Sequence, residues 1–141
     1  METTDARTGL VRLDREQCLA LLAADEVGRL AFVVGGVPTI VPVNYRLDGD
    51  TVVVRTGPGA KLHDGPRRPV AFEIDSFDRV RRQGWSVVVA GRLEEVTPYD
   101  ADVFARVHRL GVDPWADGDR SHWLRLVPSR ITGRRVGPLG S

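Results

Sequence analysis

The sequence predicts a mainly β protein with minor α content, built as an antiparallel β-barrel. Three observations lead to this fold class. Short runs of β-branched and apolar residues recur along the chain, turn residues of the hairpin type separate them, and only two segments have the apolar spacing of a helix. Many short strands with few helices between them are typical of an antiparallel barrel.

Seven segments have the composition of strands. They are 28–34, 37–46, 51–55, 70–75, 85–96, 123–127 and 130–136. Gly35-Gly36 and Asp48-Gly49 have the residues of tight hairpin turns, so each should join two neighbouring strands. Pro38 and Pro42 cannot donate a backbone hydrogen bond, which predicts an edge or a bulge in their strand. Gly91 predicts a bulge or a close backbone approach in the longest strand.

Two helices are expected, one near the N-terminus and one in the C-terminal half. Asp14 can cap the first helix, with Gln17 at the capping-box position, and this helix should end near Asp25. The second helix should begin at Thr97-Pro98, with threonine as its cap and proline at its first position.

The length of 141 residues is that of one domain with a single core. We expect a flexible N-terminus over 1–12, the barrel domain over 13–136 and a flexible tail over 137–141. Cys18 is the only cysteine, which excludes a disulfide within the chain and favours a cytoplasmic location. No apolar run has the length of a membrane-spanning helix.

The charge balance argues against two classes of partner. The chain has 20 Lys and Arg against 19 Asp and Glu, a net charge of +1. Nucleic-acid binding and polybasic membrane binding both need a concentrated basic field, so neither is expected. The local arginine clusters are interpreted as solvated turns and edges; they are Arg67-Arg68, Arg79 with Arg81-Arg82, and Arg134-Arg135.

No residue pattern predicts a self-sufficient catalytic or metal-binding site. His63, His108 and His122 are far apart and lack the spacing of metal ligands. No serine lies in a glycine-flanked nucleophile elbow. We therefore expect no catalytic side chain and no metal ligand, and any chemistry must come from a cofactor.

The loop Gly57–Lys61 is the strongest candidate for holding such a cofactor. Its glycines allow backbone N–H groups to form an anion-binding nest, although its spacing is not that of a P-loop. Lys61 is the only lysine of the chain, and Arg55 and Thr56 precede the loop. These groups could bind a phosphate. On residue types alone, a flexible connection that happens to contain a lysine is an equal alternative.

The strand 85–96 is apolar on both faces near its start. Trp85, Val87 and Val89 alternate with Ser86, Val88 and Ala90. A strand that faces water on one side should have polar residues at alternate positions. We therefore expect one face of this strand to pack on the barrel core and the other on a partner subunit.

Five stretches, taken in order, resemble the pyridoxamine 5′-phosphate oxidase-like family, the flavin-binding split β-barrels. They are VGRLAFV, VPVNYRLDGDTVVVRT with GPGAKL, VAFEID, GWSVVVAGRLEEV and WLRLVPSRITGRR, which together run from Val27 to Arg135. The most similar branch is that of the short actinobacterial members related to nitroimidazole reductases. This resemblance implies an antiparallel split barrel of the FMN-binding type.

The resemblance also implies where the cofactor lies. Its phosphate would lie against the end of the third strand and the next loop, its ring along the second strand, and its ring or ribityl chain near the start of the long strand. The residues at these positions are Arg55, Thr56, Ala60, Lys61 and Leu62 for the phosphate, Val41, Pro42, Val43, Asn44 and Tyr45 for the ring, and Trp85 and Ser86.

The activity implied by the resemblance is that of an FMN-dependent oxidoreductase acting on a small organic substrate. The family is dimeric, so a homodimer with the cofactor at the subunit interface is expected. A deazaflavin of the F-420 type or FAD could replace FMN, and a flavin-binding carrier or sensor without turnover is an alternative of another class. Arg120-Ser121-His122 has the letters of the family's substrate-phosphate element, but it precedes a strand in a shorter chain and is interpreted as a coincidence.

Overall fold

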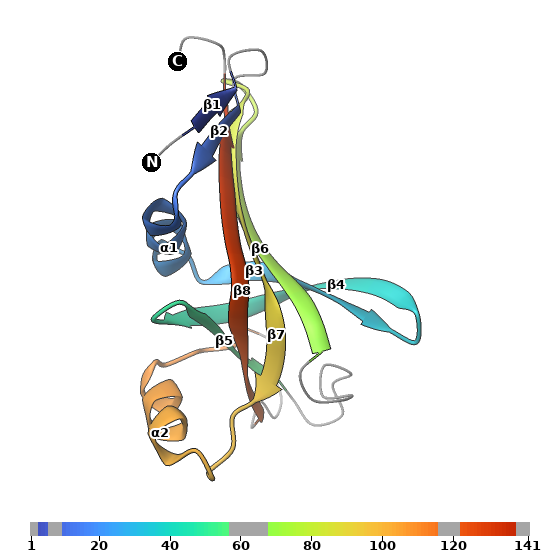
Figure 1. Ribbon diagram of the computed structural model, residues 1–141, viewed down its shortest axis with the longest axis vertical. Helices are drawn as coiled ribbons and strands as arrows, with labels where there is room; N and C mark the ends of the chain where they lie inside the picture. The colour runs from blue at the N-terminus through green and yellow to red at the C-terminus, as the bar shows by residue number, and fades with distance from the viewer. Residues whose placement is uncertain (1–2, 6–9, 57–67, 116–121, 138–141) are drawn as a thin grey trace.

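The computed structural model describes residues 3–5, 10–56, 68–115 and 122–137 (Figure 1). Its elements are β1 (Thr3–Asp5), β2 (Leu10–Leu13), α1 (Arg15–Ala24), β3 (Val27–Val34), β4 (Val37–Asp48), β5 (Thr51–Thr56), β6 (Arg68–Asp78), β7 (Gln83–Glu95), α2 (Ala101–Arg109) and β8 (His122–Val136). The mainly β fold with two helices confirms the predicted fold class. In this part of the chain, no helix has the length and apolar character that a bilayer crossing requires.

Six strands form a closed ring in the order β8-β5-β4-β3-β6-β7, because β7 also pairs with β8. All neighbours within the ring are antiparallel. The long strand β8 pairs with β7 along most of its length, and its other edge pairs first with β5 and then with β2. The ring is therefore an antiparallel barrel with β1 and β2 attached beyond one end (Figure 1).

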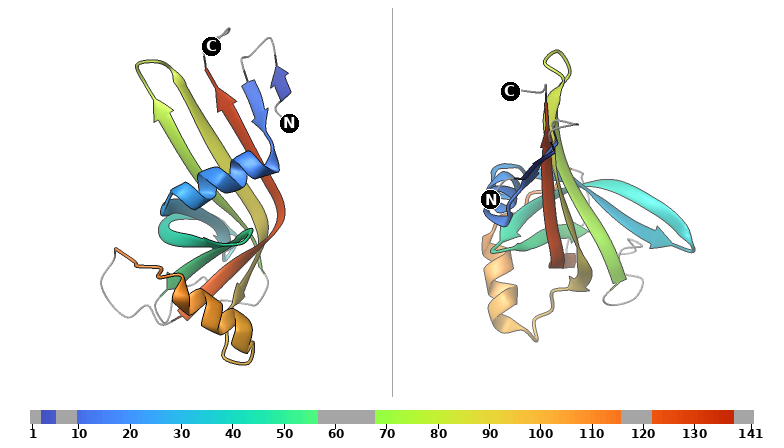
Figure 2. Two further views of the ribbon diagram at one scale, coloured as in Figure 1. Left: turned by 90° about the vertical axis from the view of Figure 1, so that its left-hand side faces the viewer. Right: turned by 45° about the horizontal axis from the view of Figure 1, so that its top comes forward.

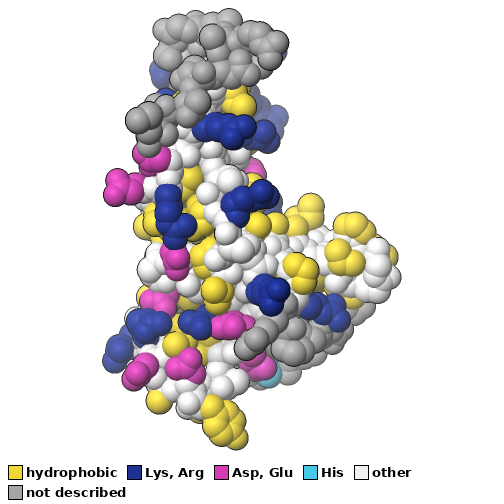
Figure 3. Space-filling view, in the orientation of Figure 1, with side chains coloured by type: hydrophobic (Ala, Val, Ile, Leu, Met, Phe, Trp, Pro, Cys, Tyr) yellow, Lys and Arg dark blue, Asp and Glu magenta, His cyan; other side chains and the backbone are white. Residues whose placement is uncertain are grey.

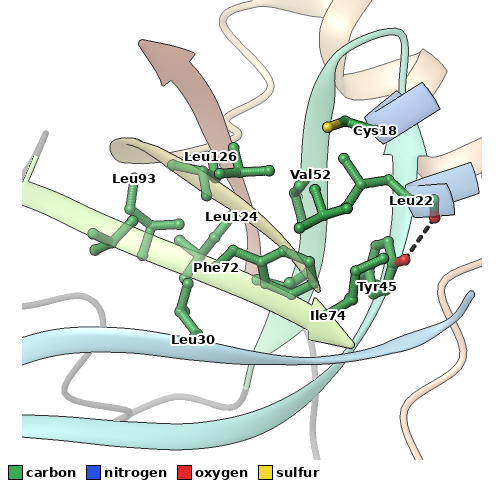
Figure 4. Close-up of a cluster of buried hydrophobic side chains, with 14 residues drawn as sticks. Cys18, Leu22, Leu30, Tyr45, Val52, Phe72, Ile74, Leu93, Leu124 and Leu126 are labelled. Atoms are coloured by element: carbon green, nitrogen blue, oxygen red, sulfur yellow. Dashed lines mark hydrogen bonds between the residues drawn. The ribbon is translucent and has the colours of Figure 1, made fainter. Parts of the chain in front are cut away.

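The barrel core consists of buried side chains from α1 and all six ring strands. Tyr45 and Phe72 are the largest fully buried residues, and their rings meet edge to face at 4.8 Å. Cys18 and Leu22 place α1 against the same core (Figure 4). A second cluster, around Val107 and Trp123, holds α2 on the other face of β5 and β8.

The hairpin of β3 and β4 extends away from the barrel, on the side opposite both helices (Figures 1 and 2). Gly35 and Gly36 form its turn with φ values of +54° and +77°, as the sequence predicts. Val33, Val37 and Ile40 are more than half exposed on this hairpin, where apolar side chains gather on the surface (Figure 3). The hairpin thus presents an apolar surface away from the core.

Gly91 is confirmed as the point of a bulge and a close backbone approach. The pairing of β7 with β8 shifts between Ala90 and Gly91. A Cβ atom on Gly91 would lie 2.1 Å from the Val127 carbonyl oxygen, so no other residue fits there without a backbone shift. The bulge lets the two expected segments 123–127 and 130–136 run on as one strand, β8, and the prediction of two separate strands is wrong.

One further prediction about the elements is corrected. The second helix begins at Ala101 rather than at Thr97-Pro98, because the chain first makes a turn in which Asp100 N–H donates to the Thr97 carbonyl oxygen (3.2 Å). The N-terminal segment also contains two short strands that were not predicted, β1 and β2, and β2 pairs with the far end of β8. The capping box of Asp14 and Gln17 is present as predicted.

Candidate functional site

Among the described residues, no strand pairs with one edge of β4 over residues 37–44. This segment pairs with β3 on one side, whereas pairing with β5 on the other side begins only at Tyr45. The Tyr45 N–H donates to the Glu26 carbonyl oxygen at 3.0 Å, toward the side of β3. Because the direction of backbone groups alternates along an antiparallel strand, the even-numbered residues of 37–44 turn their backbone groups to the unpaired edge.

The residues that face this edge are Pro38, Ile40, Pro42 and Asn44. The two prolines have no N–H to offer, which explains why they are tolerated here and confirms the predicted edge. Ile40 and Asn44 are left as the N–H donors, and all four residues have carbonyl acceptors. A flat heterocycle whose rim alternates donors and acceptors, as the rim of a flavin does, fits such an edge.

The side chains of Asn44 and Tyr45 are used within the protein itself. The Asn44 Oδ1 accepts a hydrogen bond from the Trp115 N–H at 2.9 Å. The Tyr45 hydroxyl donates to the Leu22 carbonyl oxygen at 2.6 Å (Figure 4), and burial raises the pKa of this phenol. Val41 and Val43 pack against the core. Five residues, Val41 to Tyr45, are predicted to contact the flavin ring. Among them only Pro42 has an exposed side chain, so the other four can contact a bound ring mainly through their backbone groups.

The structure describes only part of the predicted phosphate site. The Arg55 Nη1 donates to the Val112 carbonyl oxygen at 3.1 Å, and the guanidinium lies 4.8 Å from the centre of the Trp123 ring. Thr56 is buried, with 7% of its surface exposed. Arg55 therefore helps to position the segment after α2, and Thr56 is paired with His122 of β8. Ala60, Lys61 and Leu62 lie outside the described residues.

Trp85 and Ser86 lie far from Arg55 and Thr56 within one chain. Along β8, Arg55 is paired with Trp123, whereas Trp85 is paired with Arg135. These partners are twelve residues apart, which corresponds to about 40 Å of strand. A single cofactor of flavin size cannot contact both groups in one subunit.

The sequence analysis missed the segment 111–115, which the structure brings to β4. Asp113 and Trp115 line a cavity of about 100 Å³ together with Glu26, Asn44, Tyr45 and Arg46. The Trp115 residue is 70% exposed beside the unpaired edge. An irregular loop has no regular spacing of apolar residues from which its position could be predicted. The tryptophan after Pro114 was the only feature of this segment that could have indicated a role in the site.

The outer face of the barrel carries small side chains at its centre. Ala31, Ala71 and Ala90 are paired with one another across β3, β6 and β7. In the next row, Arg29 donates two hydrogen bonds to Glu73 Oε1, at 2.6 and 2.9 Å, and its Nη2 also lies 3.2 Å from Asp75. Burial and a hydrogen bond with Asp75 raise the pKa of Glu73, although Arg29 opposes this shift.

Comparisons with known proteins agree with this geometry. The family model of pyridoxamine 5′-phosphate oxidase matches residues 14–135. An uncharacterized protein of Mycobacterium tuberculosis, Rv0080, is 36% identical over 133 residues, which are 90% of this chain and 86% of that protein.

Two solved structures are similar in both fold and sequence. The FAD binding protein from Mycobacterium smegmatis is 36% identical with a TM-score of 0.74, over 88% of this chain and 98% of that one. An FAD-binding protein from Mesorhizobium loti is 25% identical with a TM-score of 0.68, over 91% and 99%. These similarities cover nearly the whole barrel. The chain therefore belongs to the pyridoxamine 5′-phosphate oxidase family, whose flavin-binding split barrels have this fold.

Proposed function

We propose that this protein is a flavin-dependent oxidoreductase that acts on a small organic substrate as a homodimer. The observation that carries the proposal is the unpaired edge of β4, where Ile40 and Asn44 provide the N–H donors and two prolines keep other strands away. The bound flavin would supply the redox chemistry, since it can accept and release hydride. The described side chains include no catalytic constellation, and no metal-binding group of His, Cys, Asp or Glu occurs among them.

The task of this chain is to hold and orient the ring. The Asn44 N–H would bind the ring rim, and its side chain fixes the Trp115 segment beside the same edge. Exposed Trp115 would cover one side of the bound ring or substrate and exclude water from it. Lys61, with Arg55 and Thr56 before it, would bind the phosphate end as the sequence predicts.

The two-ended arrangement of the predicted site residues supports the proposed dimer. Because Trp85 and Ser86 lie about 40 Å along β8 from the Arg55 end, they can join a site with it only if a second subunit supplies them. The outer face around Ala31, Ala71 and Ala90 supports such packing, because small side chains let two sheets approach closely. The exposed apolar β3–β4 hairpin adds further surface for a partner.

FAD is the cofactor that the relatives favour, with FMN as the expectation from the sequence. The two similar structures described above are both of FAD-binding proteins, one of them 36% identical to this chain. FMN and FAD share the ring and the first phosphate, so the β4 edge and the Lys61 loop suit both. A deazaflavin shares these features too.

The absorbance spectrum of the purified protein tests the proposal. An oxidised-flavin spectrum is expected, and chromatography of the released cofactor would separate FAD from FMN. Addition of a nicotinamide donor with a test acceptor should bleach and restore this spectrum over repeated turnovers. A deazaflavin would absorb at shorter wavelength, and bound flavin without turnover would identify a carrier or sensor. Protein that neither contains nor takes up any of these cofactors would contradict the proposal.

A further inference from the structure

A shallow cavity of about 300 Å³ lies beside the turn that joins β6 to β7. Its lining residues are Phe77, Asp78, Arg79, Arg82, Gln83 and Val136. None of them belongs to the flavin site proposed above. Within one chain, this end of the barrel is also remote from Arg55, because Gly84 is paired with Val136 at one end of β8 and Arg55 is paired with Trp123 near the other.

The cavity has a positive charge that the described residues do not neutralise. Asp78 is occupied by the turn, since its Oδ1 accepts the N–H groups of Val80 and Arg81 at 3.0 Å and its Oδ2 lies 3.8 Å from Arg81 Nε. Arg79 and Arg82 form no ion pair with any carboxylate in the described part of the chain. Two exposed guanidinium groups on one cavity are suited to a phosphate, which they can bind through paired N–H donors.

An aromatic ring forms one wall of the cavity. Phe77 is paired with Gly84 across the hairpin, and a Cβ atom at Gly84 would lie 2.2 Å from the Phe77 Cδ1. The ring of Phe77 therefore lies directly on the glycine backbone, which holds it in place. The residue is still 60% exposed, so a planar group can stack on it.

The backbone at Arg82 is in a conformation that arginine rarely adopts. Its φ is +55°, and among the described residues it is the only non-glycine with a positive φ. Glycine or asparagine would suit this last position of the turn better. The uncommon backbone conformation, together with a side chain that lines the cavity, motivates the hypothesis that this arginine has a function there.

Arg12 and two arginine clusters, Arg79 with Arg81-Arg82 and Arg134-Arg135, are far apart in the sequence but lie at this end of the molecule. Arg12 is paired with Arg134 in neighbouring strands, and Arg135 is paired with Trp85 just after the turn. Figure 3 shows Lys and Arg side chains at this end as well as elsewhere on the same face. These arginines are exposed, in agreement with their interpretation as solvated turns and edges, and the near-neutral charge of the whole chain conceals their grouping at one end.

We propose that the β6–β7 turn binds a mononucleotide-type ligand, a planar ring that bears a phosphate. The ring would stack on Phe77, and the phosphate would be bound by Arg79 and Arg82. This chemistry has two sources, a free nucleotide or the adenylate half of FAD held by a neighbouring subunit. The second source rests on the proposed function, whereas the first does not.

Calorimetric titration of the purified protein with AMP tests this assignment, with adenosine and inorganic phosphate as comparison ligands. If the site takes a free nucleotide, AMP should bind at least tenfold more tightly than either comparison ligand, because only AMP offers both the ring and the charge. Arg79→Gln and Arg82→Gly should each weaken AMP binding about tenfold or more. Arg81→Gln is the matched control on the same turn, since its side chain is paired with Asp78 and does not line the cavity.

Arg82→Gly carries a second readout. Glycine adopts a positive φ without strain, so this variant should have a higher melting temperature than the parent while it loses AMP binding. Such a combination cannot result from misfolding. The flavin content of the variants distinguishes a free nucleotide from the adenylate half of FAD. If the adenylate half of FAD occupies the turn, Arg79→Gln and Arg82→Gly should both lose FAD. If the ligand is a free nucleotide, both variants should keep it.

The proposal is overturned if AMP binds equally well to the parent and to both arginine variants. It is also overturned if AMP fails to bind and the variants keep their full flavin content. Protein that is isolated without any flavin would count against the proposed function alone, because the AMP titration remains valid for it.

Discussion

The hydroxyl group of Tyr45 donates a 2.6 Å hydrogen bond to the carbonyl oxygen of Leu22, so the strand with the proposed ring site is attached to α1. Leu22 lies in the last turn of α1, where carbonyl groups lack partners within the helix. Asn44, the next residue along β4, turns its backbone toward the unpaired edge. This buried phenol therefore helps to fix the position of the edge relative to the core, together with the packing of Val41 and Val43.

Tyr45→Phe should destabilise the protein by about 1–2 kcal/mol, because it leaves a buried carbonyl group without its partner. Chemical denaturation followed by circular dichroism measures this change. Tyr99→Phe is the control, since Tyr99 is 99% exposed and its hydroxyl is in water. Equal stability of the parent and Tyr45→Phe would mean that this hydrogen bond does not fix the strand.

Asn44→Pro should weaken flavin binding about three- to tenfold, because it removes the N–H that faces the edge. The barrel should stay intact, since prolines already occupy positions 38 and 42 on the same edge. Asn44→Ala is the matched control: it loses the contact with Trp115 but keeps the backbone donor. Fluorescence titration of flavin compares the two variants. Equal affinity would show that the Asn44 N–H does not contact the ring.

Lys61→Ala should weaken the binding of FMN or FAD about ten- to a hundredfold, because a charge-assisted hydrogen bond contributes roughly 1.5–3 kcal/mol. Lys61→Arg should recover only part of this affinity if a compact ammonium group is required. Riboflavin, which has no phosphate, should bind the parent and Lys61→Ala equally weakly. If Lys61→Ala binds FMN as tightly as the parent, the Gly57–Lys61 loop only connects two strands and does not bind the phosphate.

The pH dependence of stability should reveal the environment of Glu73. Its pKa in the folded protein is raised, mainly by burial and then by the hydrogen bond with Asp75. The folded state therefore holds this proton more tightly than the unfolded chain, so the contribution of Glu73 to stability is largest in acid and falls as pH rises through the raised pKa.

Melting temperatures of the parent and Glu73→Gln, measured from about pH 4 to pH 8, check this prediction, because the pH range must include the raised pKa. The stability of the parent relative to Glu73→Gln should decrease with rising pH. A difference that increases with pH would mean that Arg29 dominates and lowers the pKa of Glu73 instead.

Local signals predicted the strands and hairpins because each needs only a few adjacent residues. Gly35-Gly36 fits its turn, and Gly91 marks the bulge, whatever the rest of the chain does. The helix start at Thr97-Pro98 was wrong because the cap signal is also compatible with a simple turn. The strand β2 was missed because its support comes from β8, more than a hundred residues away.

Only the backbone arrangement of the candidate site could be predicted from the sequence. The prolines of β4 indicated an unpaired edge, which is a property of one strand. The side-chain roles of Asn44 and Tyr45 depend on Trp115 and Leu22, which no spacing in the sequence connects to β4. The separation of Trp85 from Arg55 likewise appears only when both are paired with β8.

Native mass spectrometry of the purified protein tests most directly the claim that two chains form the flavin site together. The account predicts an assembly of two 15.5 kDa chains with two non-covalent flavins, whose mass distinguishes FAD from FMN. Flavin should be absent from any monomer produced by gentle dissociation, because each site needs both subunits. A monomer that retains one flavin, or a dimer that takes up none, would contradict the account.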